Sequence, residues 1–202
     1  MARGQTKDVL LEVGRKMFLE RGYNHAGIEC ILQAAGVPKG SFYNYFESKE
    51  DFALQVIDRF AACHDAVLDG HLLDRSRRPL DRLRGYFMAI IEHLDTDQGC
   101  RGCLVGQLSQ ELAEQSESFR ARLEGIFARW VDRFAECLTE ARDAGEMELP
   151  PDGRPYAEFL LNSWQGALLR AKSARSTAPL RTFVHMTMDR VTAPEPSSAR
   201  SA

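Results

Sequence analysis

The sequence has no apolar run that approaches the roughly 18 residues a helix needs to cross a bilayer. Its first stretch, MARGQTKDVLLEVG, is charged and has no apolar segment followed by a small-residue cleavage site, so we expect no secretion signal. The five cysteines are an odd number, which argues against a complete disulfide framework. These absences predict a cytoplasmic protein with reduced thiols and no membrane partner.

Strand patterns and catalytic constellations are also missing. We find no alternating apolar pattern of the kind that predicts a half-buried strand, and no internal repeat. Ser, His and Asp residues occur, but nothing groups them as a triad, and the five histidines are scattered. We therefore expect no enzymatic activity, no catalytic residue and no cofactor.

The composition is that of a globular protein. The chain has 202 residues, of which 44% are hydrophobic and 27% charged, enough for one or two domains with a sizeable core. The net charge is −3, and residues 1–50 hold seven Lys/Arg against six Asp/Glu. This small local excess permits a nucleic-acid-binding domain but does not by itself argue for one.

Apolar residues follow helical spacing along nearly the whole chain, which predicts an all-α fold. Ile28, Ile31, Leu32 and Ala35 recur at i, i+3, i+4 and i+7, as on one face of a helix. The stretch SKED at 48–51 has the form of a capping box that begins a long helix. The last two helices are expected at 155–175 and 179–191. The small, polar tail at 192–202 is expected to be disordered.

The first three expected helices have the arrangement of a helix-turn-helix unit. A support helix at about 28–35, a tight turn at Gly36 and a short helix at about 38–45 would lay that last helix in the DNA major groove. The stretches RGY at 21–23, AAGVPKGSFYNYF and SKEDF match, in order and spacing, the DNA-binding domain of TetR-family transcriptional regulators. The resemblance covers residues 6 to about 60.

The resemblance implies a domain division and a set of DNA-facing residues. Residues 1–50 would form the helix-turn-helix DNA-binding domain, and residues 51–191 a helical domain for ligand sensing and dimerisation. Phe42 and Phe46 alternate with the polar residues and are expected in the core. Ser41 and Tyr45 have alternative roles, as a backbone cap and in packing. The positions that match the family's DNA-facing positions are Lys39, Gly40, Ser41, Tyr43, Asn44, Tyr45 and Lys49.

The same resemblance implies a homodimer that binds double-stranded operator DNA. Relatives pair their last two long helices, here residues of about 155–191, into a four-helix bundle. Two recognition helices about 34–36 Å apart would then meet a pseudo-palindromic operator. Repression is the expected effect. Several apolar side chains of these helices are expected to form faces that one subunit does not bury alone. They are Phe159, Leu160, Trp164, Leu168, Phe183, Val184 and Val191.

A second resemblance points to the signal. The runs GCLVGQLSQELAEQSESFRARLE and GALLRAKSARSTAPL are similar to a subgroup that includes NemR-type and AcuR-type repressors, which respond to electrophiles, oxidants or acrylate. It implies a sensing role for Cys103, with Lys172 as a cationic partner and Trp164 in the sensing pocket. A helix start and nearby cations lower the pKa of a thiol. Plain packing of Cys103, or a pocket for a noncovalent inducer, stays open.

The cysteines also raise a rival interpretation. Cys100 and Cys103 form a C-x-x-C pair, but no second Cys/His pair exists to complete a zinc site, so we expect no metal. Cys30, Cys63 and Cys137 lie on expected helices and are interpreted as core or half-buried. The alternative from another class is a thiol-dependent or metal-binding helical protein without a DNA role.

Overall fold

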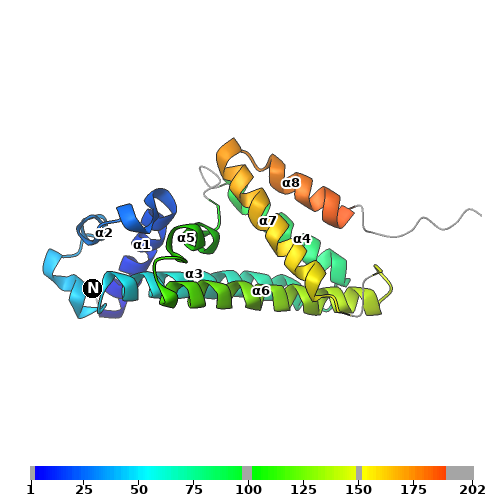
Figure 1. Cartoon of the computed structure of the whole chain (residues 1–202), viewed down its shortest axis with the longest axis horizontal. Coiled ribbons are helices and arrows are strands. Elements are labelled where there is room, and N and C mark those ends of the chain that lie inside the picture. Colours follow the sequence, from blue (N-terminus) through cyan, green and yellow to red (C-terminus); the bar gives the residue numbers. More distant parts are fainter. Residues whose placement is uncertain (1–2, 97–101, 149–151, 190–202) are drawn as a thin grey trace, which may run out of the picture. The chain divides into compact units, whose positions relative to one another are not determined.

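The computed structural model describes residues 3–96, 102–148 and 152–189, and every regular element in these ranges is a helix. The expected all-α fold is confirmed. No helix within these ranges is long and apolar enough to cross a membrane. The expected disordered tail at 192–202 lies outside the described residues. In chain order (Figure 1) the elements are α1 (Arg3–His25), α2 (Ile28–Ala35), η1 (Lys39–Asn44), α3 (Lys49–Leu72), α4 (Pro79–Thr96), α5 (Leu104–Leu112), α6 (Glu117–Asp143), α7 (Arg154–Ala174), α8 (Ala178–Val184) and η2 (His185–Asp189).

The chain divides into two compact units. Unit 1 comprises residues 1–66 and 101–128, and unit 2 comprises residues 67–100 and 129–202. The long helices α3 and α6 contribute to both units and lie side by side (Figure 1). Arg122 pairs with Asp58 in unit 1, and Arg133 pairs with Asp69 in unit 2 at 2.8 Å between Nε and Oδ1. The functional division expected near residue 50 stays a prediction.

An aromatic cluster forms the core of the N-terminal part of unit 1. Phe42 and Phe46 are 0% and 2% exposed, which confirms their expected place in the core. Their ring centroids lie 5.5 Å and 4.8 Å from that of Phe52 on α3, and Phe18 of α1 lies 5.8 Å from Phe52. A Cβ at position 14 would collide with the Phe52 ring, so Gly14 is what allows α1 to approach α3 this closely.

The segment expected as a short helix at 38–45 is a 3₁₀ helix. Its backbone bonds span three residues, as from the N–H of Ser41 to the carbonyl of Pro38 at 3.0 Å and from Tyr45 to Phe42 at 3.0 Å. Short 3₁₀ pieces are poor helices by themselves. The burial of Phe42 stabilises this 3₁₀ helix. Apolar periodicity in the sequence does not distinguish a short 3₁₀ helix from a short α-helix.

Unit 2 has its own aromatic core between α4, α6, α7 and α8. Phe87 lies at its centre, with its ring centroid 4.8 Å from Trp164, 5.0 Å from Phe183 and 5.5 Å from Phe134. All four side chains are at most 7% exposed. Since each contributes a large apolar area, this core is the main source of stability in unit 2.

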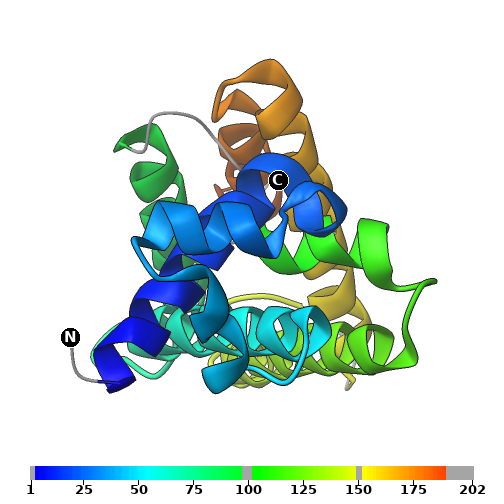
Figure 2. The same cartoon turned by 90° about the vertical axis from the view of Figure 1, so that its left-hand side faces the viewer.

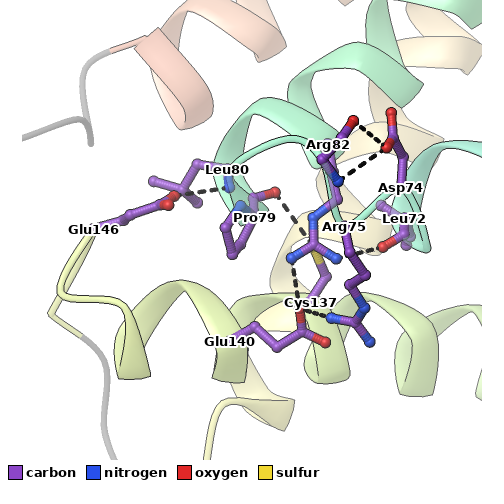
Figure 3. A network of polar contacts seen from close by, with 10 residues as sticks. Leu72, Asp74, Arg75, Pro79, Leu80, Arg82, Cys137, Glu140 and Glu146 are labelled. Carbon is purple, nitrogen blue, oxygen red and sulfur yellow. Dashed lines mark hydrogen bonds and ion pairs between the residues drawn. The ribbon is translucent and has the colours of Figure 1, made fainter.

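A polar network at one end of unit 2 surrounds Arg82 (Figure 3). Arg82 is 2% exposed and donates to the carbonyl of Leu72 at 2.6 Å and to the carboxylate of Glu140 at 2.5 Å. Glu140 also pairs with Arg75. Burial opposes ionisation of Glu140, but the hydrogen bonds from Arg75 and Arg82 prevail and lower its pKa. The network therefore holds α6 to the connection between α3 and α4.

Replacing Glu140 tests this network. Glu140→Gln leaves the Arg82 guanidinium buried without its counter-charge, and we expect the free energy of unfolding at pH 7 to fall by about 2 kcal/mol. Because the pKa of Glu140 is lowered by folding, its contribution is present above about pH 4.3 and is lost as the pH falls below that. Urea unfolding of both proteins at pH 7 and pH 3.5 measures the difference, which should shrink in acid. Glu124→Gln, at an exposed position of α6 outside this network, should be neutral at both pH values.

Candidate DNA interface and candidate sensing helix

The turn between α2 and η1 has the geometry of a helix-turn-helix. α2 spans Ile28–Ala35, as expected, and Gly36 follows in the left-handed region with φ 65° and ψ 30°. The N–H of Gly36 donates to Gln33 at 3.2 Å and that of Val37 to Leu32 at 2.9 Å, which closes the helix. Glycine adopts this conformation without the steric cost of a Cβ. The turn therefore fixes the direction in which the chain enters η1.

The buried face of η1 determines which side chains are presented outward. With Phe42 in the core, Lys39, Gly40, Tyr43 and Asn44 are exposed on the same short segment, and Tyr43 is 71% exposed (Figure 2 shows this end of the molecule). This segment thus exposes the ammonium of Lys39, the phenol of Tyr43, the amide of Asn44 and, at Gly40, backbone without a side chain. These groups suit phosphate contact and base-edge contact. Ser41 and Tyr45 are half-buried at its margin.

Lys39 has a partner that the sequence did not indicate. Its ammonium lies 3.3 Å from the carboxylate of Glu29 on α2, and both side chains are almost four-fifths exposed. An exposed pair of this kind contributes little to stability. A DNA phosphate would therefore compete with Glu29 for Lys39 at small cost. The two residues are ten positions apart across a turn, so no helical spacing pointed to the pair.

Lys49 occupies a different place from the other predicted DNA contacts. Its ammonium donates to the carbonyl of Tyr23 at 2.8 Å and lies 4.3 Å from the centroid of the Tyr23 ring. Burial lowers its pKa, although the negative charge of Glu111 opposes this. Lys49 thus joins the beginning of α3 to the end of α1. A phosphate contact by Lys49 stays a prediction.

Cys103 lies at the start of α5, as expected. It is the residue before Leu104, with extended backbone (φ −94°, ψ 126°), and its carbonyl accepts the N–H of Gln107 at 2.9 Å. Its side chain is half-buried. A sensing role for this thiol at the helix start stays a prediction. Cys100 lies outside the described residues.

The other members of the predicted sensing site lie in unit 2. Lys172 is exposed in the last turn of α7. Trp164 is 2% exposed, between Phe87 and Phe183 with ring centroids 4.8 Å and 5.2 Å away. Cys103 belongs to unit 1, and its pairing with Lys172 stays a prediction.

The remaining cysteines divide by exposure. Cys137 is buried as expected, and its burial raises the pKa of the thiol to about 12. Cys30 and Cys63 are exposed, so their interpretation as core or half-buried residues was wrong. Each lies on a helix on which apolar residues near it in sequence, such as Ile31 beside Cys30, face inward while the cysteine faces outward. In the part of the chain that the structure describes, no three His, Cys, Asp or Glu side chains are grouped to hold a metal.

The outer surface of α7 and α8 is apolar over a narrower area than expected. Leu160, Trp164, Leu168, Phe183 and Val184 are all buried within the chain, so they are core residues and correct the expected interface list. Val191 lies outside the described residues. Three large apolar side chains remain about half exposed, namely Phe159, Leu169 and Met186. A shallow groove of ≈ 510 Å³ runs between the two helices and is lined by Gly166, Ala167, Arg170, Ala174, Ser176, Ala178, Pro179 and Thr182.

The fold and the η1 surface define a helix-turn-helix DNA-binding protein with a helical C-terminal part. Residues 10–56 match the family model of bacterial regulatory proteins of the tetR family, and residues 79–187 match that of the tetracyclin repressor-like C-terminal domain. The chain therefore belongs to the tetR family, and it is a DNA-binding transcriptional regulator.

Individual relatives confirm the resemblance down to the subgroup. The chain is 44% identical to the transcriptional repressor DhaR of Mycobacterium sp. (strain GP1), over 91% of each chain. It is 40% identical to the transcriptional regulator AcuR of Cereibacter sphaeroides, over 86% of this chain and 80% of that one. The crystal structure of reduced Escherichia coli NemR superposes with a TM-score of 0.84 at 29% identity, covering 95% of this chain and 98% of the other.

Proposed function

We propose that this regulator is a homodimeric repressor that binds a pseudo-palindromic operator through η1 and releases it in response to a small organic molecule or electrophile. The observation that carries the proposal is the surface of η1, where Lys39, Tyr43 and Asn44 stand exposed above the buried Phe42. DhaR and NemR are both named repressors, which supports repression here.

Each exposed group of η1 has a proposed task on DNA. Lys39 exchanges Glu29 for a phosphate, and Gly40 lets the backbone approach the DNA closely. Asn44 has the donor and acceptor needed to pair with an adenine edge in the major groove. Tyr43 offers a hydroxyl to a phosphate or base. Ser41, Tyr45 and Lys49 complete the proposed contact set from the margin.

We propose that a second copy covers α7 and α8. Phe159 and Leu169 on α7, and Met186 on η2 directly after α8, are large apolar side chains left about half exposed. The groove between the helices is lined mainly by small residues, which allows a partner helix to pack at short distance. A two-fold interface places two copies of η1 on one DNA face, and this is what gives a short recognition segment its specificity.

The proposed sensor is the Cys103 thiol at the start of α5. Its thiolate would add to the β-carbon of an activated alkene, and the adjacent carbon would take a proton from water. Because the side chain is half-buried, we propose that the new substituent displaces its neighbours. Lys172 is the proposed cation that favours the thiolate, and Trp164 supports the pocket wall from the core. The competing version keeps the same domain but uses a noncovalent ligand.

Removal of Lys39 tests DNA binding. An operator is first selected with the wild-type protein from a pool of randomised duplexes. Lys39→Ala should weaken binding at all sequences and reduce the slope of log affinity against log salt by about 1 for each η1 engaged. Fluorescence anisotropy across a salt series measures both. Lys16→Ala, which removes an exposed lysine paired with Glu12 on α1, should leave the slope unchanged. Failure of the wild type to enrich any sequence would contradict the proposed function.

A charge on α7 tests the dimer. Leu169→Arg introduces two cations close to the two-fold axis and should give monomers by light scattering, with operator affinity lowered at least about tenfold. Leu73→Arg is the matched control, because Leu73 is similarly exposed but follows α3. A dimer that survives Leu169→Arg with full operator affinity would place the interface elsewhere.

Alkylation tests the sensor. Because Cys30 and Cys63 are exposed thiols and Cys100 is close to Cys103 in sequence, the parent protein for this experiment carries Cys30→Ser, Cys63→Ser and Cys100→Ser. The Cys137 thiol, with a pKa of about 12, should not react at pH 7.5. N-ethylmaleimide should lower operator affinity of the parent by about tenfold or more, in the range of common coupling energies. Adding Cys103→Ser should abolish the response, and an equal response in both proteins would contradict Cys103 as the sensor.

A further inference from the structure

Helix α1 contains a break close to its end. Gly22 has φ 76° and ψ 171°, outside the helical region, in the middle of a run that otherwise continues to His25. A non-helical ψ turns the amides that follow it away from the carbonyls one helical turn earlier. The N–H of the half-buried Tyr23 therefore needs another acceptor, since such amides are rarely left without one, while the N–H of the exposed Asn24 can take water or a protein group.

Two side chains of α5 satisfy the backbone at this break. The carboxylate of Glu111 accepts the N–H of Tyr23 at 2.8 Å and that of Asn24 at 2.7 Å, one on each oxygen. One α5 turn earlier, the amide of Gln107 donates to the carbonyl of Phe18 at 2.9 Å. The Gln107 amide thus donates to a carbonyl near the end of α1, and the Glu111 carboxylate accepts from the two N–H groups that follow Gly22. Figure 1 and Figure 2 both show α5 against the end of α1.

The fit at Gly22 is close enough to restrict the residue type. A Cβ at this position would lie 2.7 Å from Oε2 of Glu111, and its backbone would also be strained at φ 76°. The break and the carboxylate therefore depend on each other. Gly22 opens the helix so that two amides can face Glu111, and the small residue leaves room for the carboxylate.

The end of α1 is at the same time bound to the DNA-binding segment. Lys49, at the start of α3, donates to the carbonyl of Tyr23 at 2.8 Å, and the N–H of Ala26 donates to the same carbonyl at 3.2 Å. After Ala26 only Gly27 separates this turn from α2. A change in how Glu111 holds Tyr23 therefore reaches both α2 and α3, the two helices between which η1 lies in the chain.

We infer that Glu111 and Gln107 are positioning residues through which α5 fixes the α1–α2 turn and hence the orientation of η1. Cys103, Gln107 and Glu111 are spaced at i, i+4 and i+8, so they follow one face of α5. Resting on the proposed function, the inference adds that modification of Cys103 shifts α5 and loosens the two bonds made by Glu111. Release from DNA then follows from a reoriented turn and needs no contact between the inducer and η1.

The test compares amide exchange and operator binding in the full-length protein carrying Cys30→Ser, Cys63→Ser and Cys100→Ser. Glu111→Gln should make the amides of Tyr23 and Asn24 exchange about tenfold faster, because hydrogen bonds to a charged acceptor contribute free energy of that order. It should also lower operator affinity before any treatment. The ratio of operator affinities without and with N-ethylmaleimide should then fall to near one. In the parent, N-ethylmaleimide alone should accelerate the same two amides, and Cys103→Ser should prevent this.

The controls separate positioning from general destabilisation. Glu114→Gln removes a charge from an exposed position two residues after α5 and should behave as the parent in every measurement. Gln107→Ala removes the hydrogen bond to the Phe18 carbonyl but leaves both bonds of Glu111, and it should give a smaller effect of the same kind. This variant keeps the test valid if Glu111→Gln does not fold. A purely structural Glu111 would lower the melting temperature yet leave the N-ethylmaleimide response intact, and that result would overturn the inference.

The inference and the proposed function fail in different ways. If the parent binds its selected operator but does not respond to N-ethylmaleimide, the covalent sensor is contradicted. Exchange at Tyr23 and Asn24 and the untreated operator affinity of Glu111→Gln still decide the positioning role in that case. Unchanged exchange together with unchanged affinity would overturn it.

Discussion

The burial of Phe42 and Phe46 against Phe52 is the interaction on which the DNA-facing surface depends. A 3₁₀ segment of six residues has too few hydrogen bonds to persist alone. Burying each phenylalanine contributes about 2 kcal/mol, and edge-to-face contacts with Phe52 add to this. With these rings fixed, Lys39, Tyr43 and Asn44 are held on the outer side. The proposed DNA contacts therefore depend on the burial of these aromatic rings.

The helix that bears the candidate sensor belongs to the same compact unit as this surface. Unit 1 includes α5 and the first part of α6 together with α1, α2 and η1. α5 reaches the DNA-binding segment through backbone groups of α1, and not through side chains of η1. Since backbone positions move with the helix as a whole, a shift at this contact is transmitted as a rotation or translation of an element. This is the kind of motion that changes operator affinity without altering the DNA contacts themselves.

Local patterns predicted the local features of this structure, and the contacts between distant segments were beyond them. Periodicity located α2 at its observed bounds with Gly36 as its end, and alternation with polar residues indicated Phe42 and Phe46 as core residues, because each pattern is contained within a few neighbouring positions. The bond from Glu111 to Tyr23 joins residues 88 positions apart, and no spacing rule reaches that far. The prediction that Cys30 lies in the core or is half-buried failed for a related reason. Cys30 adjoins apolar residues in sequence, but its direction on α2 places its side chain on the outside.

The two hydrogen bonds that Glu111 accepts after Gly22 have an intermediate strength, which is what the proposed change of operator affinity requires. Hydrogen bonds from amides to a carboxylate contribute about 1.5–3 kcal/mol each, so two of them bias an equilibrium by a factor of roughly 10² to 10⁴. A larger, apolar contact such as the Phe52 cluster would be too costly to break with one small adduct. An exposed ion pair such as Lys39–Glu29 would be too weak to hold an orientation. Between these limits, charge-assisted bonds to a helix break have the strength that the proposed switch requires, enough to orient the DNA-binding segment and little enough for one adduct to offset.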